Sequence, residues 1–334
     1  MHPLQIADAS QVGAARRAAV ELAQSLGFDE ATTGRVSVIV TEAGTNLVKH
    51  GRGGHLVLGV VEEAGRSQLE IVALDRGPGI ASVPRSLEDG YSTSGSPGTG
   101  LGAMRRMASS FDIYSRPGHG TAVLARVGAL ARPSVDERPR RVEVGGLCVA
   151  MNGEDACGDA WEEEARAGGV TLVVADGLGH GLGAADASRE AVAVFRSRRG
   201  SPPAARLEAI HAALRSTRGA AVAIAEVDLQ ALVVRFAGLG NVCARLVAAD
   251  RVRHLVSHNG TAGHAARRID EFTYPWVSGD VLVMHTDGLA TQRDLTAYPG
   301  LTGRHPSLVA AVLYRDFARG RDDAAVVVAR ERAA

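Results

Sequence analysis

The sequence predicts an α/β (α+β) protein of two domains, and three observations support this. Its 334 residues exceed the usual size of one domain and suit two. Residues 129–141, ALARPSVDERPRR, combine two prolines with dense charge and no apolar period, as a linker does. Helices and strands alternate before this break, whereas strands dominate after it. We therefore expect one domain over 1–128 and another over 142–330.

An amphipathic helix opens the first expected domain. Apolar residues recur at helical spacing over 12–26. Asp8 or Ser10 can cap the start of this helix, and Gly27 can cap its end. The other expected elements are helices over 33–48 and 101–109 and strands over 55–61, 69–74, 111–115 and 121–127. The Gly/Ser/Pro-rich stretch 75–102 is too long for a simple turn, and long irregular segments of this kind are often functional lids.

Strands dominate the second expected domain. They are expected over 143–151, 170–175, 221–228, 231–237, 244–248, 281–285 and 324–329, with long helices over 183–198 and 203–217. Two segments echo each other, VVADGL at 173–178 and MHTDGL at 284–289. Each is an apolar strand that runs into Asp-Gly-Leu, so each places an acidic residue at the end of a strand.

Charge and cysteine content exclude several classes of protein. The 37 Lys and Arg residues balance the 37 Asp and Glu residues, whereas nucleic-acid-binding proteins carry a basic surplus. Cys148, Cys157 and Cys243 lack the spacing of metal ligands, and we expect reduced thiols in a cytoplasmic protein. Residues 1–10 lack the features of a secretory signal, and no run of 18 apolar residues predicts a membrane span.

A carboxylate and a carboxamide share one face of the helix expected over 33–48. Glu42 and Asn46 are four residues apart, which places them one above the other. A carboxylate can take a proton from a nucleophile, and an amide oxygen can ligate Mg²⁺. A polar helix face in solvent would show the same pair, so the pair alone does not decide the function.

Two glycine-rich turns follow in the same domain. Asp75 ends a strand and heads a DxGxG motif with Gly77 and Gly79. Its carboxylate can accept a hydrogen bond from an exocyclic amine such as that of adenine, and the glycines let the backbone approach a flat ring. The second turn, GTGLG, opens a helix whose free N–H groups suit phosphates; its glycines are Gly98, Gly100 and Gly102. Each motif alone also fits an ordinary turn or linker.

In this order the motifs resemble the GHKL-type (Bergerat) ATP-binding fold over 1–128, and within it the RsbT-like anti-sigma and switch kinases. Gly120-Thr121 at a strand start completes the set, and TEAGTNLVKHGRGG and PGHGTAV add to the likeness. The resemblance implies a two-layer α/β domain that binds ATP with Mg²⁺, with Glu42 as general base and Asn46 as Mg²⁺ ligand. It implies that 81–97 form a lid and that the Thr121 hydroxyl helps to hold Asp75 and the base. The other implied ATP contacts are Asp75 for adenine, Gly77 and Gly79 as its floor, and Gly98, Gly100 and Gly102 around the phosphates.

Acidic residues stand at strand ends in the second expected domain. Asp176 and Asp287 follow strands, and Asp322 precedes one. If this last strand runs antiparallel to the other two, the three carboxylates meet at one edge of the sheet. Gathered carboxylates are costly without a cation, and their hard oxygens select Mg²⁺ or Mn²⁺. Two such ions can activate a water for in-line attack on phosphorus. Each acid alone also fits a common Asp-Gly turn.

The ordered set of acidic motifs resembles the PPM-type metal-dependent serine/threonine phosphatases, in their SpoIIE- and RsbX-like branch, over 142–330. GEDACGDAW, VADGLGHGLGAADAS, GLGN, HTDGL and RDDAAVVVAR occur in the order of that family. The resemblance implies an α-β-β-α sandwich with two Mn²⁺ or Mg²⁺ ions. The implied ligands are Asp159, Asp176 as the bridge, the Gly177 carbonyl, Asp287 and Asp322, with Asp323 as an adjacent candidate. His180 matches a family position but is expected to be structural. The arginine that clamps phosphate in eukaryotic relatives is missing before Asp159.

Two opposed activities in one chain suggest one shared substrate. By resemblance, this is a small STAS-domain protein of an anti-anti-sigma or stressosome-like switch, whose Ser or Thr the first domain phosphorylates and the second dephosphorylates. Two alternatives stay open. The ATP domain could sequester a sigma factor or another regulator, or it could serve as a nucleotide sensor for the phosphatase. A homodimer is also compatible, because many relatives of the ATP domain dimerise.

Overall fold

The computed structural model describes residues 3–63, 65–88, 100–128, 140–248, 250–290 and 295–332. The chain divides into two compact units, Met1–Arg138 and Pro139–Ala334. Of the expected linker 129–141, only residues 140 and 141 are among those described. The helices formed by the described residues include none with the length and apolar content needed to cross a membrane.

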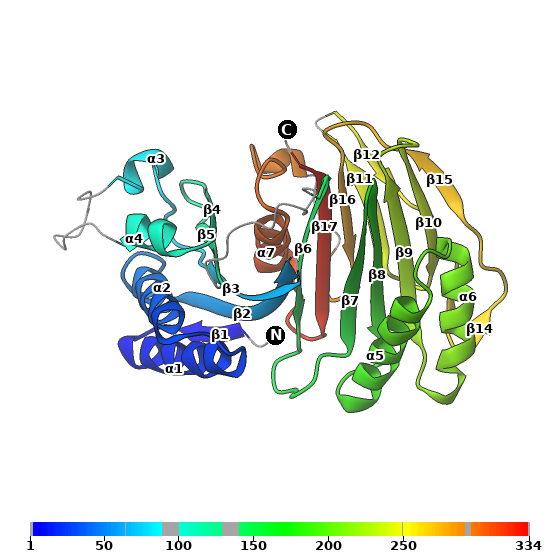
Figure 1. Ribbon diagram of the computed structural model, residues 1–334, viewed down its shortest axis with the longest axis horizontal. Helices are drawn as coiled ribbons and strands as arrows, with labels where there is room; N and C mark the ends of the chain where they lie inside the picture. Colours follow the sequence, from blue (N-terminus) through cyan, green and yellow to red (C-terminus); the bar gives the residue numbers. More distant parts are fainter. Residues whose placement is uncertain are drawn as a thin grey trace. The chain divides into compact units, whose positions relative to one another are not determined.

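The N-terminal unit is built on one five-stranded antiparallel sheet (Figure 1). In the order β1-β2-β3-β5-β4, its strands are β1 (Pro3–Ile6), β2 (Gly54–Glu63), β3 (Arg66–Leu74), β5 (Thr121–Val127) and β4 (Ser110–Ser115). The helices are α1 (Ala9–Ser25), α2 (Glu30–Lys49), α3 (Val83–Ser86) and α4 (Gly100–Met107). Helix α2 contacts α1, α4 and the sheet, which gives the expected two-layer α/β arrangement.

Local sequence determines where the first two helices begin. The Asp8 carboxylate accepts hydrogen bonds from the amides of Ser10 and Gln11, and the Gln11 side chain accepts from the Asp8 amide, which completes a capping box. Asp29 caps α2 through the Thr32 amide at 2.8 Å. The buried stripe of α2 that packs on the sheet comprises Val36, Ile39, Val40, Ala43 and Leu47.

The C-terminal unit is a sandwich of two five-stranded sheets. One sheet consists of β15 (Phe272–Pro275), β10 (Val233–Leu239), β9 (Ala220–Asp228), β8 (Gly169–Gly177) and β7 (Asp159–Arg166). The other consists of β12 (Val252–His254), β11 (Cys243–Val247), β16 (Val281–His285), β17 (Ala324–Glu331) and β6 (Val142–Val149). A small pair, β13 (Gly260–Thr261) and β14 (Ala265–Ala266), stands beside them. Aliphatic side chains of both sheets form one core.

Helices cover the two outer faces of this sandwich (Figure 1). Helix α5 (Leu182–Ser197) contacts β8 and β7, and α6 (Pro203–Ala213) contacts β9 and β10. Helix α7 (Pro306–Phe317) contacts β6 and β17 of the other sheet. The short 3₁₀ segments are Leu214–Ser216 and Leu295–Ala297. The expected α-β-β-α sandwich is therefore confirmed.

Several strands and helices were not predicted from the sequence, for physical reasons. Strand β1 is four residues long, too short for a periodic signal. Strand β7 carries three consecutive glutamates, which hide its alternation. Those side chains are held by ion pairs with arginines, such as Arg206 with Glu164. Most residues of α7 are buried, so it lacks the polar stripe that marks a surface helix.

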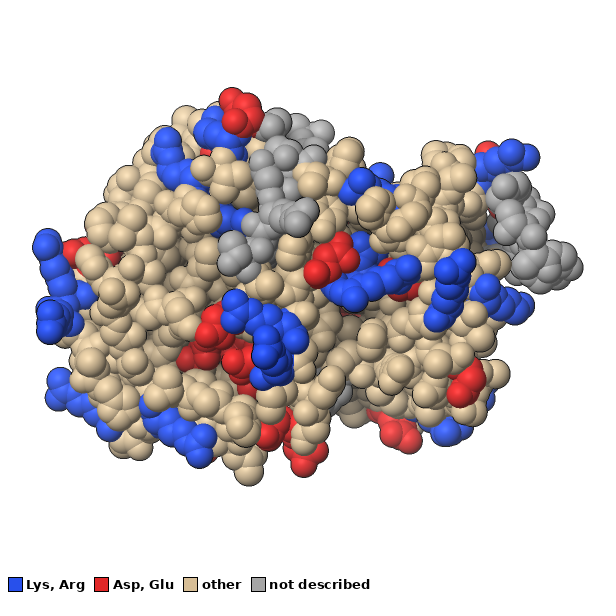
Figure 2. Space-filling model, turned by 180° about the vertical axis from the view of Figure 1, so that it is seen from behind, with Lys and Arg blue, Asp and Glu red and all other residues tan. Residues whose placement is uncertain are grey.

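Charged side chains of both signs lie on the face of the protein that Figure 2 shows. On the face shown in Figure 2, basic and acidic residues alternate over short distances among the described residues. This mixture agrees with the zero net charge of the sequence.

Candidate active sites

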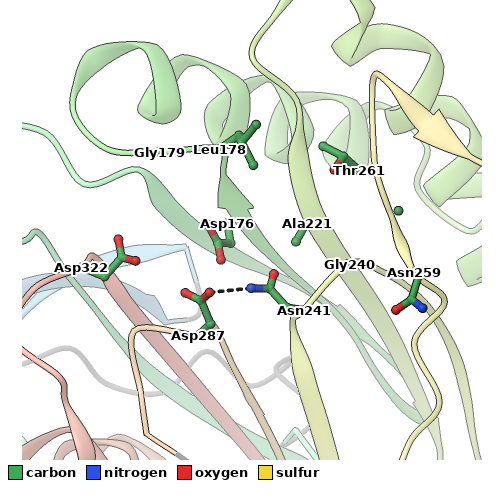
Figure 3. A pocket seen from close by; sticks show the side chains of 11 residues that line it. Asp176, Leu178, Gly179, Ala221, Gly240, Asn241, Asn259, Thr261, Asp287 and Asp322 are labelled. Atoms are coloured by element: carbon green, nitrogen blue, oxygen red, sulfur yellow. Dashed lines mark hydrogen bonds between the residues drawn. The ribbon is translucent and has the colours of Figure 1, made fainter.

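A pocket of about 370 Å³ opens at one end of the sandwich (Figure 3). Its lining residues are Asp176, Leu178, Gly179, Ala221, Gly240, Asn241, Asn259, Gly260, Thr261, Asp287 and Asp322. Three carboxylates from distant parts of the sequence thus face one volume, as the expected Mg²⁺ or Mn²⁺ ligands would.

The three acidic residues come from both sheets. Asp176 lies near the end of β8, whereas Asp287 follows β16 and Asp322 precedes β17. Strands β16 and β17 run antiparallel, which brings Asp287 and Asp322 to the same end. The expectation that all three share the edge of one sheet was wrong, because β8 belongs to the opposite sheet. The site therefore depends on how the two sheets pack.

Burial and like charge dominate the electrostatics of the pocket. Burial and, after it, the charges of Asp287, Asp322 and Asp323 together raise the pKa of Asp176 to about 7. Burial also raises the pKa of Asp322. Uncompensated carboxylates of this kind fit a divalent cation. Among the described residues, no three His, Cys, Asp or Glu side chains are grouped closely enough to hold a metal ion as they stand. The three carboxylates line a shared volume instead.

Asp159 lies next to Asp176 but deeper in the protein. The two residues are paired across β7 and β8, and Asp159 is only 5% exposed. Its Oδ2 accepts a hydrogen bond from the Thr286 hydroxyl at 2.6 Å. Burial, followed by the charge of Asp176, raises its pKa well above the usual range. Asp159 is outside the pocket lining, so its role as a metal ligand stays a prediction.

Hydrogen bonds distinguish Asp322 from its neighbour Asp323. Asp323 is buried, and its two oxygens accept hydrogen bonds from the amides of Met151 and Gly158, both at 2.8 Å. Asp322 lines the pocket. Asp323 therefore holds the segment before β7. Asp322 faces the pocket instead, and its role as a metal ligand stays a prediction.

Gly177 ends β8 directly after Asp176. Its amide donates to the Gly158 carbonyl at 3.1 Å. A Cβ at this position would lie 2.1 Å from the Ala184 carbonyl oxygen, so close packing on α5 requires glycine. The role of the Gly177 carbonyl oxygen as a metal ligand stays a prediction.

The pocket includes polar residues to which the sequence analysis gave no role. Asn241 donates a hydrogen bond to Asp287 Oδ2, which orients that carboxylate (Figure 3). The GLGN motif at 238–241 was the available signal for it. Asn259 also lines the pocket but lies in an irregular segment without a motif. His180 is largely exposed, with its Nδ1 2.6 Å from Glu154 Oε1, and its charge acts to lower the pKa of Asp322.

The pKa of Asp176 predicts how metal binding depends on pH. The folded pKa of about 7 exceeds the ordinary value of 3.8, so between these pH values the folded state binds more protons than the unfolded state. As the pH rises through this window, Asp176 therefore lowers the free energy of unfolding of the metal-free protein. Metal binding needs the ionised form, so Mn²⁺ affinity should rise about fivefold from pH 6 to 7 and about tenfold from pH 6 to 8, and then level off. Thermal shifts with Mn²⁺ that are equal at pH 6 and 8 would contradict this.

In the N-terminal unit, Glu42, Asn46 and Gly100 lie together. Glu42 and Asn46 are on α2, and Gly100 begins α4. A Cβ on Gly100 would lie 3.2 Å from Glu42 Oε2 and 3.6 Å from Asn46 Oδ1. The structure thus brings a carboxylate and a carboxamide to the start of a helix, where free N–H groups favour phosphate.

Asp75 is held at the end of β3 by backbone amides. Its Oδ1 accepts from Gly77 at 2.8 Å and from Thr121 at 3.1 Å. The contact of Thr121 with Asp75 runs through the backbone, whereas the Thr121 hydroxyl lies 2.9 Å from Ser115 Oγ. Gly79 has φ of +70°, and a Cβ there would lie 2.1 Å from the Arg116 carbonyl oxygen. These hydrogen bonds and close contacts fix the conformation of the DxGxG turn and the position of the Asp75 carboxylate.

Part of the expected phosphate loop falls outside the described residues. This applies to Gly98 and to the portion of the expected lid 81–97 beyond residue 88. The described portion of that lid includes the one-turn helix α3. Gly102 lies in the first turn of α4 on its buried side. Of the two GTGLG glycines among the described residues, Gly100 is the one that lies against Glu42 and Asn46.

Gly100→Ala should impair phosphoryl transfer more than folding. The added methyl would press on the Glu42 carboxylate, a flexible group that can move without disturbing the core. At 3.2 Å the added Cβ requires the Glu42 carboxylate to shift slightly, and displacing a catalytic group by about 1 Å can cost up to about 100-fold in rate. We expect a several-fold slower transfer from ATP with a nearly unchanged Tm. An unchanged transfer rate would contradict a role for Glu42 that depends on its position beside Gly100.

Two family matches divide the chain as the two sites do. Residues 6–127 match the histidine kinase-like ATPase domain. Residues 166–332, half of the chain, match Stage II sporulation protein E (SpoIIE). The chain belongs to the SpoIIE family. This SpoIIE-family chain is also 34% identical over 112 residues to the serine/threonine-protein kinase RsbT of Bacillus subtilis (strain 168), a match covering 34% of this chain and 84% of that kinase.

Several solved structures are similar in fold to part or most of this chain. One, from work on the bacterial stressosome as a modular system adapted to control secondary messenger signalling, has a TM-score of 0.53 and 29% identity, and covers 57% of this chain and 99% of its own. RsbX in complex with magnesium has a TM-score of 0.50 at 18% identity, with 59% and 98% covered. The structure of the PP2C phosphatase domain and a fragment of the regulatory domain of SpoIIE from Bacillus subtilis gives a TM-score of 0.50 at 18% identity, with 96% of this chain and 93% of that chain covered. The predicted fusion of an RsbT-like kinase domain with a SpoIIE-type phosphatase domain is confirmed.

Proposed function

We propose that this chain is a cytoplasmic, bifunctional enzyme of a partner-switching system. Its N-terminal unit phosphorylates Ser or Thr of a STAS-domain protein with ATP, and its C-terminal unit removes that phosphate with two Mn²⁺ or Mg²⁺ ions. The carboxylate pocket of Asp176, Asp287 and Asp322 is the observation that supports the hydrolytic half most strongly. The corresponding observation for the kinase half is the grouping of Glu42, Asn46 and Gly100.

In the phosphatase unit, carboxylates of both sheets would position the ions. Asp176 faces the pocket from one sheet, and Asp287 and Asp322 face it from the other, with Asn241 orienting Asp287. Bound ions would supply charge for phosphate and an activated water. Gly177 and Asp159 extend the same end of β8 and β7, where they complete the proposed ligand set.

In the kinase unit, the groups divide between base, metal and nucleotide. Glu42 would accept the proton of the substrate hydroxyl, since it lies beside the helix start that suits the phosphates. Asn46 would ligate Mg²⁺ one turn further along α2. Asp75, held rigidly by two backbone amides, would accept the adenine amine.

The proposed partner follows from the relatives. RsbT is named a serine/threonine-protein kinase, and one structural neighbour comes from work on the stressosome. A STAS-domain protein is the shared substrate that fits both, and a sigma factor is the alternative partner.

A direct transfer assay tests this function. The Asp176→Asn chain, which lacks the phosphatase activity, is incubated with γ-labelled ATP, Mg²⁺ and a STAS-domain protein from the same cells; label should accumulate on the partner and decline when wild-type chain and Mn²⁺ are then added. Glu42→Ala should prevent labelling, and Asp176→Asn should preserve the label. A partner that is never labelled refutes the kinase role. A Glu42→Ala chain that keeps its full regulatory effect would instead favour sequestration or nucleotide sensing.

A further inference from the structure

Two cysteines lie in contact beside the carboxylate pocket. Cys148, near the end of β6, has its Sγ 3.2 Å from Sγ of Cys157, in the segment that leads to β7. Neither cysteine forms a disulfide in the structure, and both are partly buried. A disulfide joins sulfurs about 2.05 Å apart, so the bond requires a relative movement of about 1.2 Å. We propose that Cys148 and Cys157 form a reversible disulfide that inactivates the phosphatase site.

The cysteine pair is directly connected to the acidic residues of the site. Cys157 lies two residues before Asp159, and Cys148 Sγ lies 3.1 Å from the Asp159 carbonyl oxygen. The intervening Gly158 accepts a hydrogen bond from the amide of Gly177, the residue after Asp176. Drawing the two sulfurs together therefore moves the segment that positions Asp159 and contacts the end of β8.

Close packing prevents this segment from absorbing the movement. A Cβ on Gly158 would lie 2.7 Å from Asp323 Oδ2 and 2.8 Å from the Cβ of Ala184 on α5. Asp323 also holds the amide of Met151, at the other end of the same loop. Well-packed interiors transmit such shifts to their neighbours instead of absorbing them. The neighbour here is Asp322, next to Asp323 in sequence and part of the pocket lining.

A hydroperoxide is the class of oxidant that completes the chemistry. The Cys157 sulfur attacks one peroxide oxygen, so an S–O bond forms, the O–O bond breaks, and the other oxygen leaves as an alcohol or water with the thiol proton. The Cys148 sulfur then attacks the resulting sulfenic acid, the S–S bond forms, and the sulfenic oxygen leaves as water. Two thiols lose two electrons in total and one peroxide gains them. A thiol reductant reverses the bond by exchange.

Peptide mapping tests the bond itself, independently of any enzymatic activity. Trypsin releases Val142–Arg166 as one peptide that contains both cysteines, and Phe236–Arg245 as another that contains Cys243. After hydrogen peroxide treatment of the full chain and alkylation with iodoacetamide, the first peptide should lose two hydrogens and carry no alkyl group. The second should stay alkylated. Dithiothreitol should restore two alkylation sites on the first peptide.

Activity and metal binding test the switch, which rests on the proposed phosphatase function. Oxidised wild type should hydrolyse p-nitrophenyl phosphate with Mn²⁺ at least tenfold more slowly and bind Mn²⁺ more weakly, and dithiothreitol should reverse both changes. Cys148→Ser and Cys157→Ser should resist the loss, whereas Cys243→Ser should remain sensitive. Two alkylated cysteines in the oxidised peptide would overturn the proposal, as would a disulfide that leaves Mn²⁺ binding unchanged. If reduced wild type is inactive while the disulfide still forms and weakens Mn²⁺ binding, the failure belongs to the proposed phosphatase function.

Discussion

Asp176→Asn should abolish Mn²⁺-dependent phosphate hydrolysis while ATP binding stays at the wild-type level. The substitution removes the central negative charge of a pocket that also contains Asp287 and Asp322. Metal ions contribute several kcal/mol to a transition state of this kind, and every 1.4 kcal/mol is tenfold in rate, so the loss should be about 100-fold or more. Hydrolysis of p-nitrophenyl phosphate with Mn²⁺ measures it.

The same substitution should make the metal-free protein more stable. With its pKa raised to about 7, ionised Asp176 opposes folding at pH 8 by up to about 4 kcal/mol, and Asn removes that charge. A higher Tm together with lost activity would show that the charge needed for ion binding lowers the stability of the metal-free protein. Asp186→Asn, on the exposed surface of α5, is the matched control and should change neither property. A variant that remains active would exclude Asp176 as the bridging ligand.

The acidic residues of the pocket could be located from the sequence, because local motifs mark them. The Asp-Gly-Leu echo identified Asp176 and Asp287, and the structure brings both to one pocket. Their arrangement across two sheets was not predictable, because it depends on long-range packing of β8 against the sheet that contains β16 and β17. The resemblance already favoured Asp322 over Asp323, and the structure adds the physical difference between them, because hydrogen bonds from the amides of Met151 and Gly158 hold the Asp323 carboxylate.

Residues without a local motif were missed for the same reason. Asn259 reaches the pocket from an irregular segment, and the contact between Cys148 and Cys157 depends on how the end of β6 meets the segment before β7. No spacing in the sequence encodes a contact between such segments. Glu42 and Asn46, by contrast, share a helix face by geometry alone, so their proximity followed directly from the four-residue spacing.

Asp75→Asn should weaken ATP binding by about 10- to 100-fold without loss of fold. The Asn side-chain oxygen can still accept from the Gly77 and Thr121 amides, which hold the turn at the end of β3. The substitution replaces a charged acceptor with a neutral amide, and a hydrogen bond to a charged group is worth about 1.5–3 kcal/mol. Calorimetric titration with ATP and Mg²⁺ measures the change, and the Tm of the variant should stay close to that of the wild type.

The phosphatase unit provides the internal control for this variant. Because Asp75 and the carboxylate pocket belong to separate compact units, hydrolysis with Mn²⁺ should be unchanged by Asp75→Asn. Glu21→Gln, on the exposed side of α1, removes the same charge from the same unit and should leave ATP binding intact. Wild-type affinity in Asp75→Asn would exclude this carboxylate as the adenine anchor. Equal damage to both activities in a folded variant would instead show that the two units do not act as separate catalytic domains.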